Sequence, residues 1–329
     1  MLAAMQPASK LALTVVVSVP LACVAAPGEG EPCRRESTFD YGGSAVVTCG
    51  SGLECDRLLC LPPDGPEAPR RFGDFVALYD PSSSSAERIF ETEGNGSPWR
   101  VLDASRLVMG GDFIREVRPA PGSSRVIGER LRENQTDSLA STGTELWALG
   151  VLGSTRGYSL PDLTPLSMGL YLGPDGGRMI AGNEDGELAW LGRGEVVLTR
   201  ERGAVRETVA LPGTTQGLVV EPGWAVVALQ DGQLVSPTGR GLAPHEALSG
   251  LHRPLGGPTL AWIDPNDATT PTRVVAIDDE GELVPIVELP IELSSLTRID
   301  AHEGHLYLSC EWGLFVSAEP LLGLRSPSP

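Results

Sequence analysis

The chain has 329 residues and a formal net charge of −18 at pH 7, because 43 acidic residues outnumber 25 basic ones. Binding to nucleic acid or to an anionic membrane surface needs patches of Lys and Arg, so this charge argues against both. The hydrophobic content of 41% excludes a disordered acidic tail. Gly and Pro are frequent along the whole chain, which fits many tight turns between short strands.

Residues 1–26 have the features of a secretory signal peptide. A single cation, Lys10, precedes an apolar run from Leu11 to Val19, and small residues follow. Such a run is too short for a comfortable transmembrane helix and is typical of the leader of an exported protein. The sequence therefore predicts export, followed by removal of the leader.

The position of cleavage is open. The text before Cys23 resembles the acceptor site of bacterial lipoproteins, although Pro20 stands where such sites carry an aliphatic residue. Ordinary cleavage after Ala25 or Ala26 is the alternative. We therefore expect either a freely secreted protein or one that touches the membrane only through a lipid on Cys23.

Residues 27–61 are predicted to form a small cysteine-rich module. Cys33, Cys49, Cys55 and Cys60 lie close together in a Gly-rich stretch. Four cysteines in an exported segment predict two disulfides, with three pairings open, and their spacing fits a zinc site poorly. The text CGSGLEC at 49–55, followed by Cys60, resembles a phrase in the N-terminal cysteine-rich regions of Dickkopf-type proteins. A Pro-rich linker, 62–71, is predicted to end the module.

Residues 72–322 contain a recurring phrase, in which an apolar run, an acidic or Gly-rich turn and a second apolar run follow one another. Copies of it occupy Leu107–Ile114, Leu146–Tyr158, Arg178–Trp190, Trp224–Val235, Arg273–Val284 and His305–Val316. Each phrase predicts a β-hairpin, because the turn glycine supplies the positive φ that a tight turn needs. The first run is apolar at consecutive positions, which predicts a strand covered on both faces, such as the inner strand of a propeller blade.

The spacing of these hairpins predicts a repeat architecture. The turn glycines Gly111, Gly153, Gly186, Gly232, Gly281 and Gly313 recur every 40 residues or so. Short strand candidates precede four of the hairpins, at Trp99–Asp103, Gly217–Glu221, Pro258–Asp264 and Leu296–Asp300. Residues 72–322 thus resemble β-propellers of the WD40, NHL or YVTN kind, and the resemblance implies an all-β fold with a short tail at 323–329.

We count six blades and favour six over seven. Two further strand candidates, Phe75–Tyr79 and Arg88–Glu91, are predicted either to complete the last blade or to form a degraded seventh. Helical periodicity is nearly absent, and its best fragment is Leu248–Leu251. A sandwich of two packed sheets is the alternative fold, although sandwiches rarely show a period of this length.

No catalytic motif is present in the sequence. His302 and His305 are predicted to lie in a solvated turn, and Cys310 is predicted to be a small buried residue in a strand. We therefore predict a monomeric, non-enzymatic binding protein for a protein or glycan partner. The alternative is an extracellular metal-dependent hydrolase, lactonase or lyase. Carboxylates clustered at the channel mouth would favour that enzyme, whereas an apolar plug would favour the binding protein.

The hairpin turns carry the candidate ligand-binding residues. If every turn follows the second strand of its blade, all of them lie at one end of the channel and form an acidic rim. Its candidate members are Asp112, Asn183, Asp185, Asp231, Asp278, Asp279 and Glu311. No cofactor is required by the sequence, but oxygen ligands that converge from several turns are suited to Ca²⁺ or to a basic partner. Asp-Gly is also a favourable hairpin turn, which is the structural explanation for the same residues.

Overall fold

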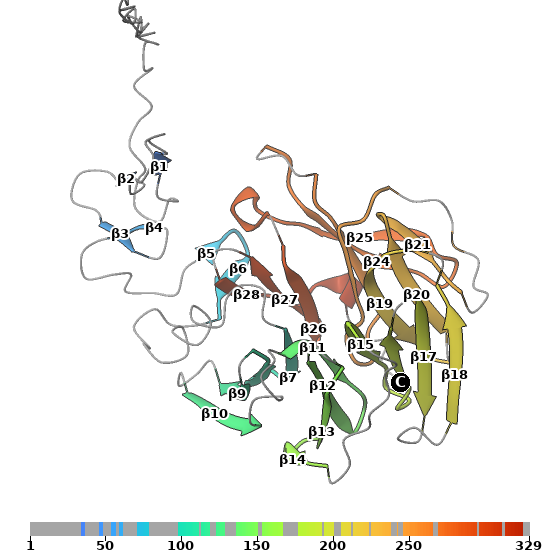
Figure 1. Cartoon of the computed structure of the whole chain (residues 1–329). Coiled ribbons are helices and arrows are strands. Elements are labelled where there is room, and N and C mark those ends of the chain that lie inside the picture. Colours follow the sequence, from blue (N-terminus) through green and yellow to red (C-terminus); the bar gives the residue numbers. More distant parts are fainter. Residues whose placement is uncertain are drawn as a thin grey trace, which may run out of the picture. The chain divides into compact units, whose positions relative to one another are not determined.

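The computed structural model divides the chain into two compact units, Met1–Pro63 and Asp64–Pro329 (Figure 1). It describes residues 34–36, 46–48, 54–56, 59–61, 71–78, 98–111, 113–118, 123–128, 136–150, 153–166, 177–192, 194–200, 205–211, 213–223, 225–237, 242, 246–265, 269–294, 296–310 and 313–324.

The N-terminal unit contains two short antiparallel hairpins. They pair β1 (Arg34–Glu36) with β2 (Val46–Thr48), and β3 (Glu54–Asp56) with β4 (Leu59–Leu61). Cys55 and Cys60 are directly opposite each other in the register of β3 and β4. Cys23, Cys33 and Cys49 lie outside the described residues. The two disulfides and the lipid anchor therefore stay predictions.

The second unit is a β-propeller of six antiparallel sheets, or blades, taken here in chain order. Blade 1 holds β7 (Trp99–Asp103), β8 (Arg106–Met109), β9 (Ile114–Arg118) and β10 (Ser123–Gly128). Blade 2 holds β11 (Thr136–Ser141), β12 (Glu145–Gly150), β13 (Thr155–Ser159) and β14 (Thr164–Pro165). Blade 3 holds β15 (Met179–Gly182), β16 (Leu188–Leu191), β17 (Glu195–Arg200) and β18 (Val205–Ala210).

The other three blades complete the count. Blade 4 has three described strands, β19 (Thr215–Glu221), β20 (Ala225–Gln230) and β21 (Gln233–Val235). Blade 5 holds β22 (Gly250–His252), β23 (Thr259–Ile263), β24 (Arg273–Ile277) and β25 (Leu283–Glu288). Blade 6 holds β26 (Arg298–His302), β27 (His305–Cys310) and β28 (Gly313–Ser317), followed by β6 (Phe75–Ala77) and β5 (Arg71–Phe72).

The ring closes in two ways. The first strands contact one another in the cyclic order β7, β11, β15, β19, β22, β26 and back to β7. In addition, the N-terminal strand β6 pairs with the C-terminal strand β28, with Ala77 opposite Phe315, and the rings of Phe72 and Phe315 lie 5.4 Å apart. The segment left over at the front thus completes the sixth blade, and the prediction of a six-bladed propeller is confirmed. The candidate strand Arg88–Glu91 lies outside the described residues.

Local turn chemistry explains why the hairpins form. All six predicted turn glycines have positive φ, and in the β20–β21 turn Asp231 (φ 48°) and Gly232 (φ 77°) are both left-handed. This pair is what a type I′ turn requires. At positive φ a side chain with a Cβ is strained, so glycine is favoured at these positions. The glycine pattern in the sequence therefore correctly located the hairpins.

The position of each hairpin within its blade differs from the prediction. The apolar run is the second strand in blades 1, 2, 4 and 6, the first strand β15 in blade 3, and the third strand β24 in blade 5. Second strands are covered on both faces because neighbouring blades pack against each other face to face. In β12, for example, all six residues are buried. Consecutive apolar positions therefore mark the middle of a blade here, except in blade 3, and not its inner edge.

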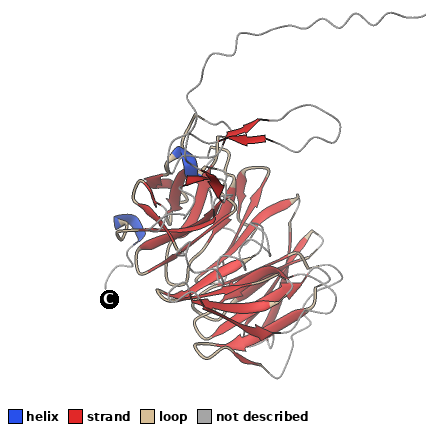
Figure 2. Cartoon of the chain, turned by 90° about the vertical axis from the view of Figure 1, so that its left-hand side faces the viewer, coloured by secondary structure: helices blue, strands red, loops and turns tan. Residues whose placement is uncertain are grey.

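Aromatic and aliphatic side chains fill the spaces between blades. Trp147 of blade 2 and Trp190 of blade 3 meet edge to face with 6.1 Å between ring centroids. Cys310 is fully buried, as predicted. In the described residues helix is limited to two 3₁₀ turns, Ile291–Leu293 and Leu322–Leu324 (Figure 2). No helix in that part of the chain is long and apolar enough to cross a membrane. The predicted helical fragment 248–251 instead leads into the inner strand β22.

Candidate functional site

A cavity of about 320 Å³ occupies the channel between the first strands of the blades. Its lining includes Arg100, Ser138, Arg178, Gln216, His252 and Arg298, so every blade contributes. Arg178, Gln216, Ser249 and Thr297 are exposed, and each lies at or just before the start of an inner strand. The cavity therefore opens at the end of the channel where the inner strands begin. We call this opening the channel mouth.

The cavity lining is basic, although the protein is strongly acidic. Four arginines contribute to it, Arg100, Arg178, Arg253 and Arg298, and no Asp or Glu is among the described residues that line it. The chain as a whole has a formal charge of −18. Positive charge is thus gathered at one site against the overall balance of the molecule. Among the described residues of the lining there is neither the carboxylate cluster nor the apolar plug considered from the sequence.

Asp300 organises a buried cluster on the wall of this cavity. Its carboxylate lies 3.6 Å from Arg100 Nη1 and 3.0 Å from His252 Nε2, and all three side chains are buried or nearly so. The same carboxylate accepts hydrogen bonds from the amides of Val101 (3.0 Å) and Ala301 (2.9 Å). Two backbone amides, Arg100 and His252 therefore converge on Asp300, and these contacts tie together blades 1, 5 and 6.

The contacts of Asp300 lower its pKa. Burial alone raises the pKa of a carboxyl group, but His252, Arg100 and the Val101 amide outweigh this effect and bring the pKa of Asp300 to about 2. Arg100 keeps its positive charge when buried, since a guanidinium stays protonated under all ordinary conditions. Asp300 is therefore ionised at neutral pH and compensates the charge of Arg100.

His252 is held neutral in this cluster. Burial and the neighbouring charge of Arg100 lower the pKa of His252 to about 4. Its Nε2 lies 2.5 Å from Arg100 Nη1 and 3.0 Å from Asp300 Oδ1. In a neutral ring this nitrogen either accepts from Arg100 or donates to Asp300, but it does not do both. The imidazole therefore acts as an adaptable link between a permanent cation and its counter-ion.

A second ion pair lies beyond this cluster, where the inner strands end. Arg253 Nη2 is 3.0 Å from Glu184 Oε1. The Nε atoms of Arg253 and Arg100 are buried without a hydrogen-bond partner in the described part of the chain. Asn183 donates to the carbonyl oxygen of Glu221 at 3.0 Å. These contacts join blades 3, 4 and 5 away from the channel mouth.

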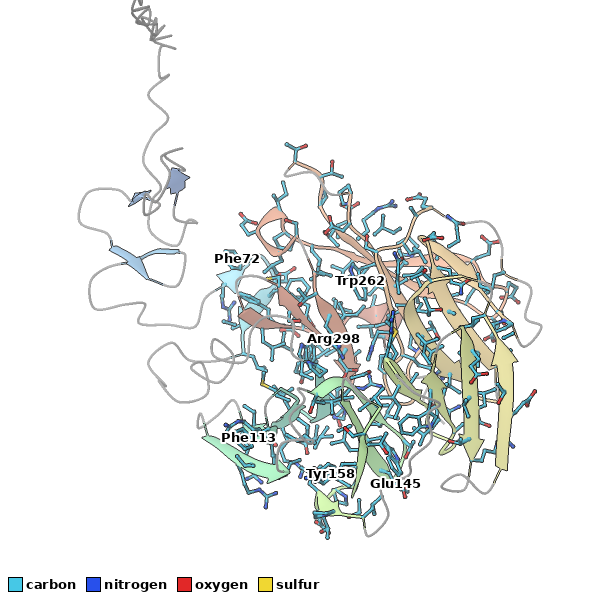
Figure 3. All side chains as sticks on the ribbon, in the orientation of Figure 1. Phe72, Phe113, Glu145, Tyr158, Trp262 and Arg298 are labelled. Atoms are coloured by element: carbon cyan, nitrogen blue, oxygen red, sulfur yellow. The ribbon has the colours of Figure 1, made fainter. Side chains whose placement is uncertain are left out.

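The two other arginines of the cavity form no ion pair within the described part of the chain. Neither Arg178 nor Arg298 forms an ion pair with a described residue, although both line the cavity. Burial, and to a smaller extent repulsion by Arg100, lower the pKa of Arg298 to about 10, while the attraction of Asp300 acts in the opposite direction. Figure 3 shows Arg298 near the middle of the ring of blades. After the two internal pairs are counted, the cavity keeps the charges of Arg178 and Arg298.

The structure does not gather the predicted acidic residues into one rim. Asp231 lies between the second and third strands of blade 4, whereas Asn183 and Asp185 lie between the first and second strands of blade 3. Asp278 and Asp279 lie between the third and fourth strands of blade 5. Successive strands are antiparallel, so these last two turns lie at the opposite end of the ring from Asp231. The prediction of a single rim is therefore wrong.

The other predicted rim residues do not form a ligand site in the described part of the chain. Asp112 and Glu311 lie outside the described residues. Asn183 is buried and donates to Glu187 Oε2 (2.6 Å), while its Oδ1 accepts from the amides of Asp185 and Glu187. It therefore shapes its own turn. In the described part of the chain no three His, Cys, Asp or Glu side chains are grouped as ligands for a metal ion. Calcium binding stays a prediction.

Sequence reasoning missed the residues that do converge. Arg100, Arg298 and Asp300 lie within strand candidates that were identified, Trp99–Asp103 and Leu296–Asp300. The available signal was a charged residue inside a short strand that precedes a hairpin. His252 was overlooked because its strand was interpreted as the end of a helical fragment. A turn lies between His302 and His305, with Glu303 exposed at its tip, but the two histidines themselves are half-buried and end β26 and begin β27, so they do not lie in the turn as predicted.

Comparisons with known proteins add only to the description of the fold. No protein-family model matches the chain, and no curated protein sequence is significantly similar to it. Nothing in them supports the resemblance of residues 27–61 to Dickkopf-type regions.

Several solved structures share the propeller architecture. The WD40 repeats of RRP9 are 11% identical with a TM-score of 0.46, and the match covers 68% of this chain and 79% of that one. A chain of the mitotic checkpoint complex is 10% identical with a TM-score of 0.49, covering 86% and 98%. YCF48 bound to the D1 peptide is 13% identical with a TM-score of 0.44, covering 78% and 85%. At such values the likenesses do not indicate what this chain binds.

Proposed function

We propose that this chain is an exported, non-enzymatic binding protein that holds its ligand in the cavity at the channel mouth. The observation that carries the proposal is the cavity itself, about 320 Å³ in volume and lined by residues from the inner strands of all six blades. Ligand sites in proteins are typically clefts of about 300–1,000 Å³ with a few convergent polar groups. A ring of packed sheets holds such groups rigidly, which limits the entropy lost on binding.

The state of His252 supports binding rather than catalysis. It is the histidine of the cavity wall, and Arg100 Nη1 lies 2.5 Å from its Nε2 and 3.4 Å from its Nδ1. The ring is therefore engaged with protein groups, and its pKa of about 4 keeps it neutral. A general base works best with a pKa near the operating pH. This imidazole is better suited to supporting the wall than to transferring protons.

Export is part of the proposal and rests on the leader at residues 1–26. Mass spectrometry of the protein from its native host tests it. We expect a chain that begins between residues 23 and 27, with a diacylglyceryl group if Cys23 is the new N-terminus. An intact Met1 in cytosolic protein would contradict export without affecting the binding site.

The binding site is tested by filling the channel mouth. Gln216 is an exposed cavity residue of blade 4, and Gln233 is an exposed residue of the same blade that is not part of the lining. Gln216→Trp should block the mouth, while Gln233→Trp adds the same side chain elsewhere. Both variants, with wild type, are screened by thermal shift against small molecules, short peptides and oligosaccharides.

We expect compounds that raise the melting temperature of wild type and of Gln233→Trp, but not of Gln216→Trp. The proposal fails if every stabilising compound acts equally on Gln216→Trp, or if no compound of any class stabilises wild type. A peptide or oligosaccharide that depends on the cavity would also identify the class of partner, which stays a prediction.

A further inference from the structure

We propose that the cavity ligand is a small organic dianion, held between Arg178 and Arg298. This inference rests on the proposed function, because it names the class of ligand for the same cavity. The shared chemistry is a compact molecule that carries two negative charges as carboxylate or phosphate. Arginine suits this role, since its planar guanidinium presents paired donors that match the oxygens of either group.

The first step of the argument is the charge that remains in the cavity. Arg100 is compensated by Asp300, and Arg253 is compensated by Glu184. Arg178 and Arg298 form no ion pair with a described residue, and no carboxylate belongs to the described lining. Asp300 attracts Arg298 as well, but it is already paired with Arg100, so four arginines face two carboxylates. Two positive charges are therefore left at one site. Arg178 is exposed, whereas Arg298 is partly buried. A partly desolvated cation that lacks an ion pair is unfavourable, and a bound anion removes that cost.

The second step is the placement of the two arginines around the ring. Arg178 immediately precedes β15 of blade 3, and Arg298 begins β26 of blade 6. In the cyclic order of the inner strands these two blades are three positions apart, so they face each other across the channel. A ligand in the cavity thus meets a guanidinium from each side. This arrangement favours a molecule with two separated anionic groups over a single point charge.

The third step is size. Water occupies about 30 Å³ in the liquid, so a cavity of about 320 Å³ corresponds to roughly ten non-hydrogen atoms. Small dicarboxylic acids are close to this size, a sugar phosphate is somewhat larger and would extend into the open channel mouth, and polymeric anions are far larger. The exposed amide of Gln216 at the mouth provides a neutral hydrogen-bonding group for the rest of such a ligand. The cavity therefore fits a small molecule better than a macromolecular segment.

The fourth step concerns selectivity. The net charge of −18 repels anions at long range, so the protein does not collect them by its overall field. Recognition of an anion must come from short-range contacts inside the cavity. Arg298 is partly buried there, and its lowered pKa of about 10 shows that water stabilises its charge poorly. An interaction with this side chain is less screened by salt than one at an open surface.

The test uses ligands that are matched in size and differ in charge. Succinate, succinamide and 1,4-diaminobutane share a four-carbon length, and glucose 6-phosphate is compared with glucose. Binding to the mature protein is measured by calorimetry and thermal shift. The variants are Arg178→Gln and Arg298→Gln, and the control is Arg71→Gln in β5, an exposed arginine on the outermost strand of blade 6.

We expect succinate or glucose 6-phosphate to bind wild type and Arg71→Gln, while their neutral and cationic counterparts do not bind. Each cavity variant should weaken affinity about tenfold or more, and the double variant should abolish binding. Binding of succinate alone would indicate a dicarboxylate ligand, and binding of glucose 6-phosphate alone would indicate a phosphate monoester. Circular dichroism and the apo melting temperature verify that both variants fold, which is expected because neither arginine has a described ion partner.

Two outcomes would overturn the inference. If a neutral or cationic compound binds wild type but not Gln216→Trp, the cavity is a binding site and the dianion assignment is wrong. If dianions bind with the same affinity after both arginines are replaced, they bind elsewhere. Failure of the proposed function is a separate result. In that case no compound of any charge would lose its binding when Gln216→Trp blocks the channel mouth.

Discussion

Replacement of His252 by Gln should flatten the dependence of stability on pH. In the folded protein the pKa of His252 is lowered from 6.5 to about 4 by burial and by Arg100, with Asp300 acting in the opposite direction. Between these two pH values the unfolded chain binds a proton that the folded chain does not. Stability is therefore complete above the unfolded pKa and decreases as the pH falls from about 6.5 towards 4.

The magnitude follows from the two pKa values. For a single site they give a loss of about 2 kcal/mol at pH 5 and about 3 kcal/mol at pH 4, relative to pH 8. A small domain is stable by about 5–15 kcal/mol in total, so a loss of this size is readily measured. Glutamine cannot be protonated in this range, and its amide still offers a donor and an acceptor to Asp300 and Arg100. Other groups that titrate in both proteins cancel in the comparison.

The assay is urea unfolding followed by tryptophan fluorescence, at several pH values from about 7.5 down to about 4.5. The difference in unfolding free energy between wild type and His252→Gln should shift in favour of the variant as the pH falls. His302→Gln serves as the control, because that residue ends β26 beside the β26–β27 turn and takes no part in the Asp300 cluster. If wild type and His252→Gln lose stability in parallel, then His252 is not a buried neutral histidine and the account of the cluster is wrong.

Four further predictions test other parts of the structure. Asp300→Asn should lower the unfolding free energy by about 3–5 kcal/mol at pH 7, because it leaves Arg100, which is only 4% exposed, without a carboxylate; an unchanged urea midpoint would contradict the buried pair. Arg298→Gln should stabilise the ligand-free protein by about 1–3 kcal/mol, since it removes a desolvated charge that has no described counter-ion; destabilisation in the same assay would indicate a partner for Arg298. Gly250→Ala should destabilise by about 1–3 kcal/mol or more, because its Cβ would come within 1.9 Å of the Trp262 ring, whereas Gly177→Ala meets only ordinary contacts and should have little effect. Thiol counting on the denatured, non-reduced mature protein should find Cys310 alone, and five thiols would refute the two predicted disulfides.

The architecture could be predicted because its causes are local. A hairpin needs a residue with positive φ between two apolar runs, and each of the six turn glycines has that conformation. The pattern left two possibilities for the strand candidate Phe75–Tyr79, completion of the last blade or a degraded seventh, and its pairing with β28 is the first of them. Repetition at a mean spacing of about 40 residues then indicated a propeller.

Which two strands of its blade each hairpin joins could not be predicted in the same way. Nothing local distinguishes a turn between the first and second strands, such as the one at Asn183, from a turn between the second and third strands, such as the one at Asp231. The difference depends on how many strands precede the hairpin in its blade, and some of those strands are short and weakly apolar. An error of one strand moves a turn to the other end of the ring. The proposed acidic rim failed for this reason.

Long apolar runs also do not identify the strands that line the channel. Such runs mark strands that are covered on both faces, and in this propeller those are mostly second strands such as β12 and β20. Inner strands border the channel, so charged residues on them can reach the cavity. Arg100, Arg298 and Asp300 each lie in a short strand candidate just before a hairpin, where a buried charge has a counter-ion or faces the cavity. A charged residue inside a strand that precedes a predicted blade hairpin is therefore a better sequence indicator of a channel site than an acid within the hairpin turn.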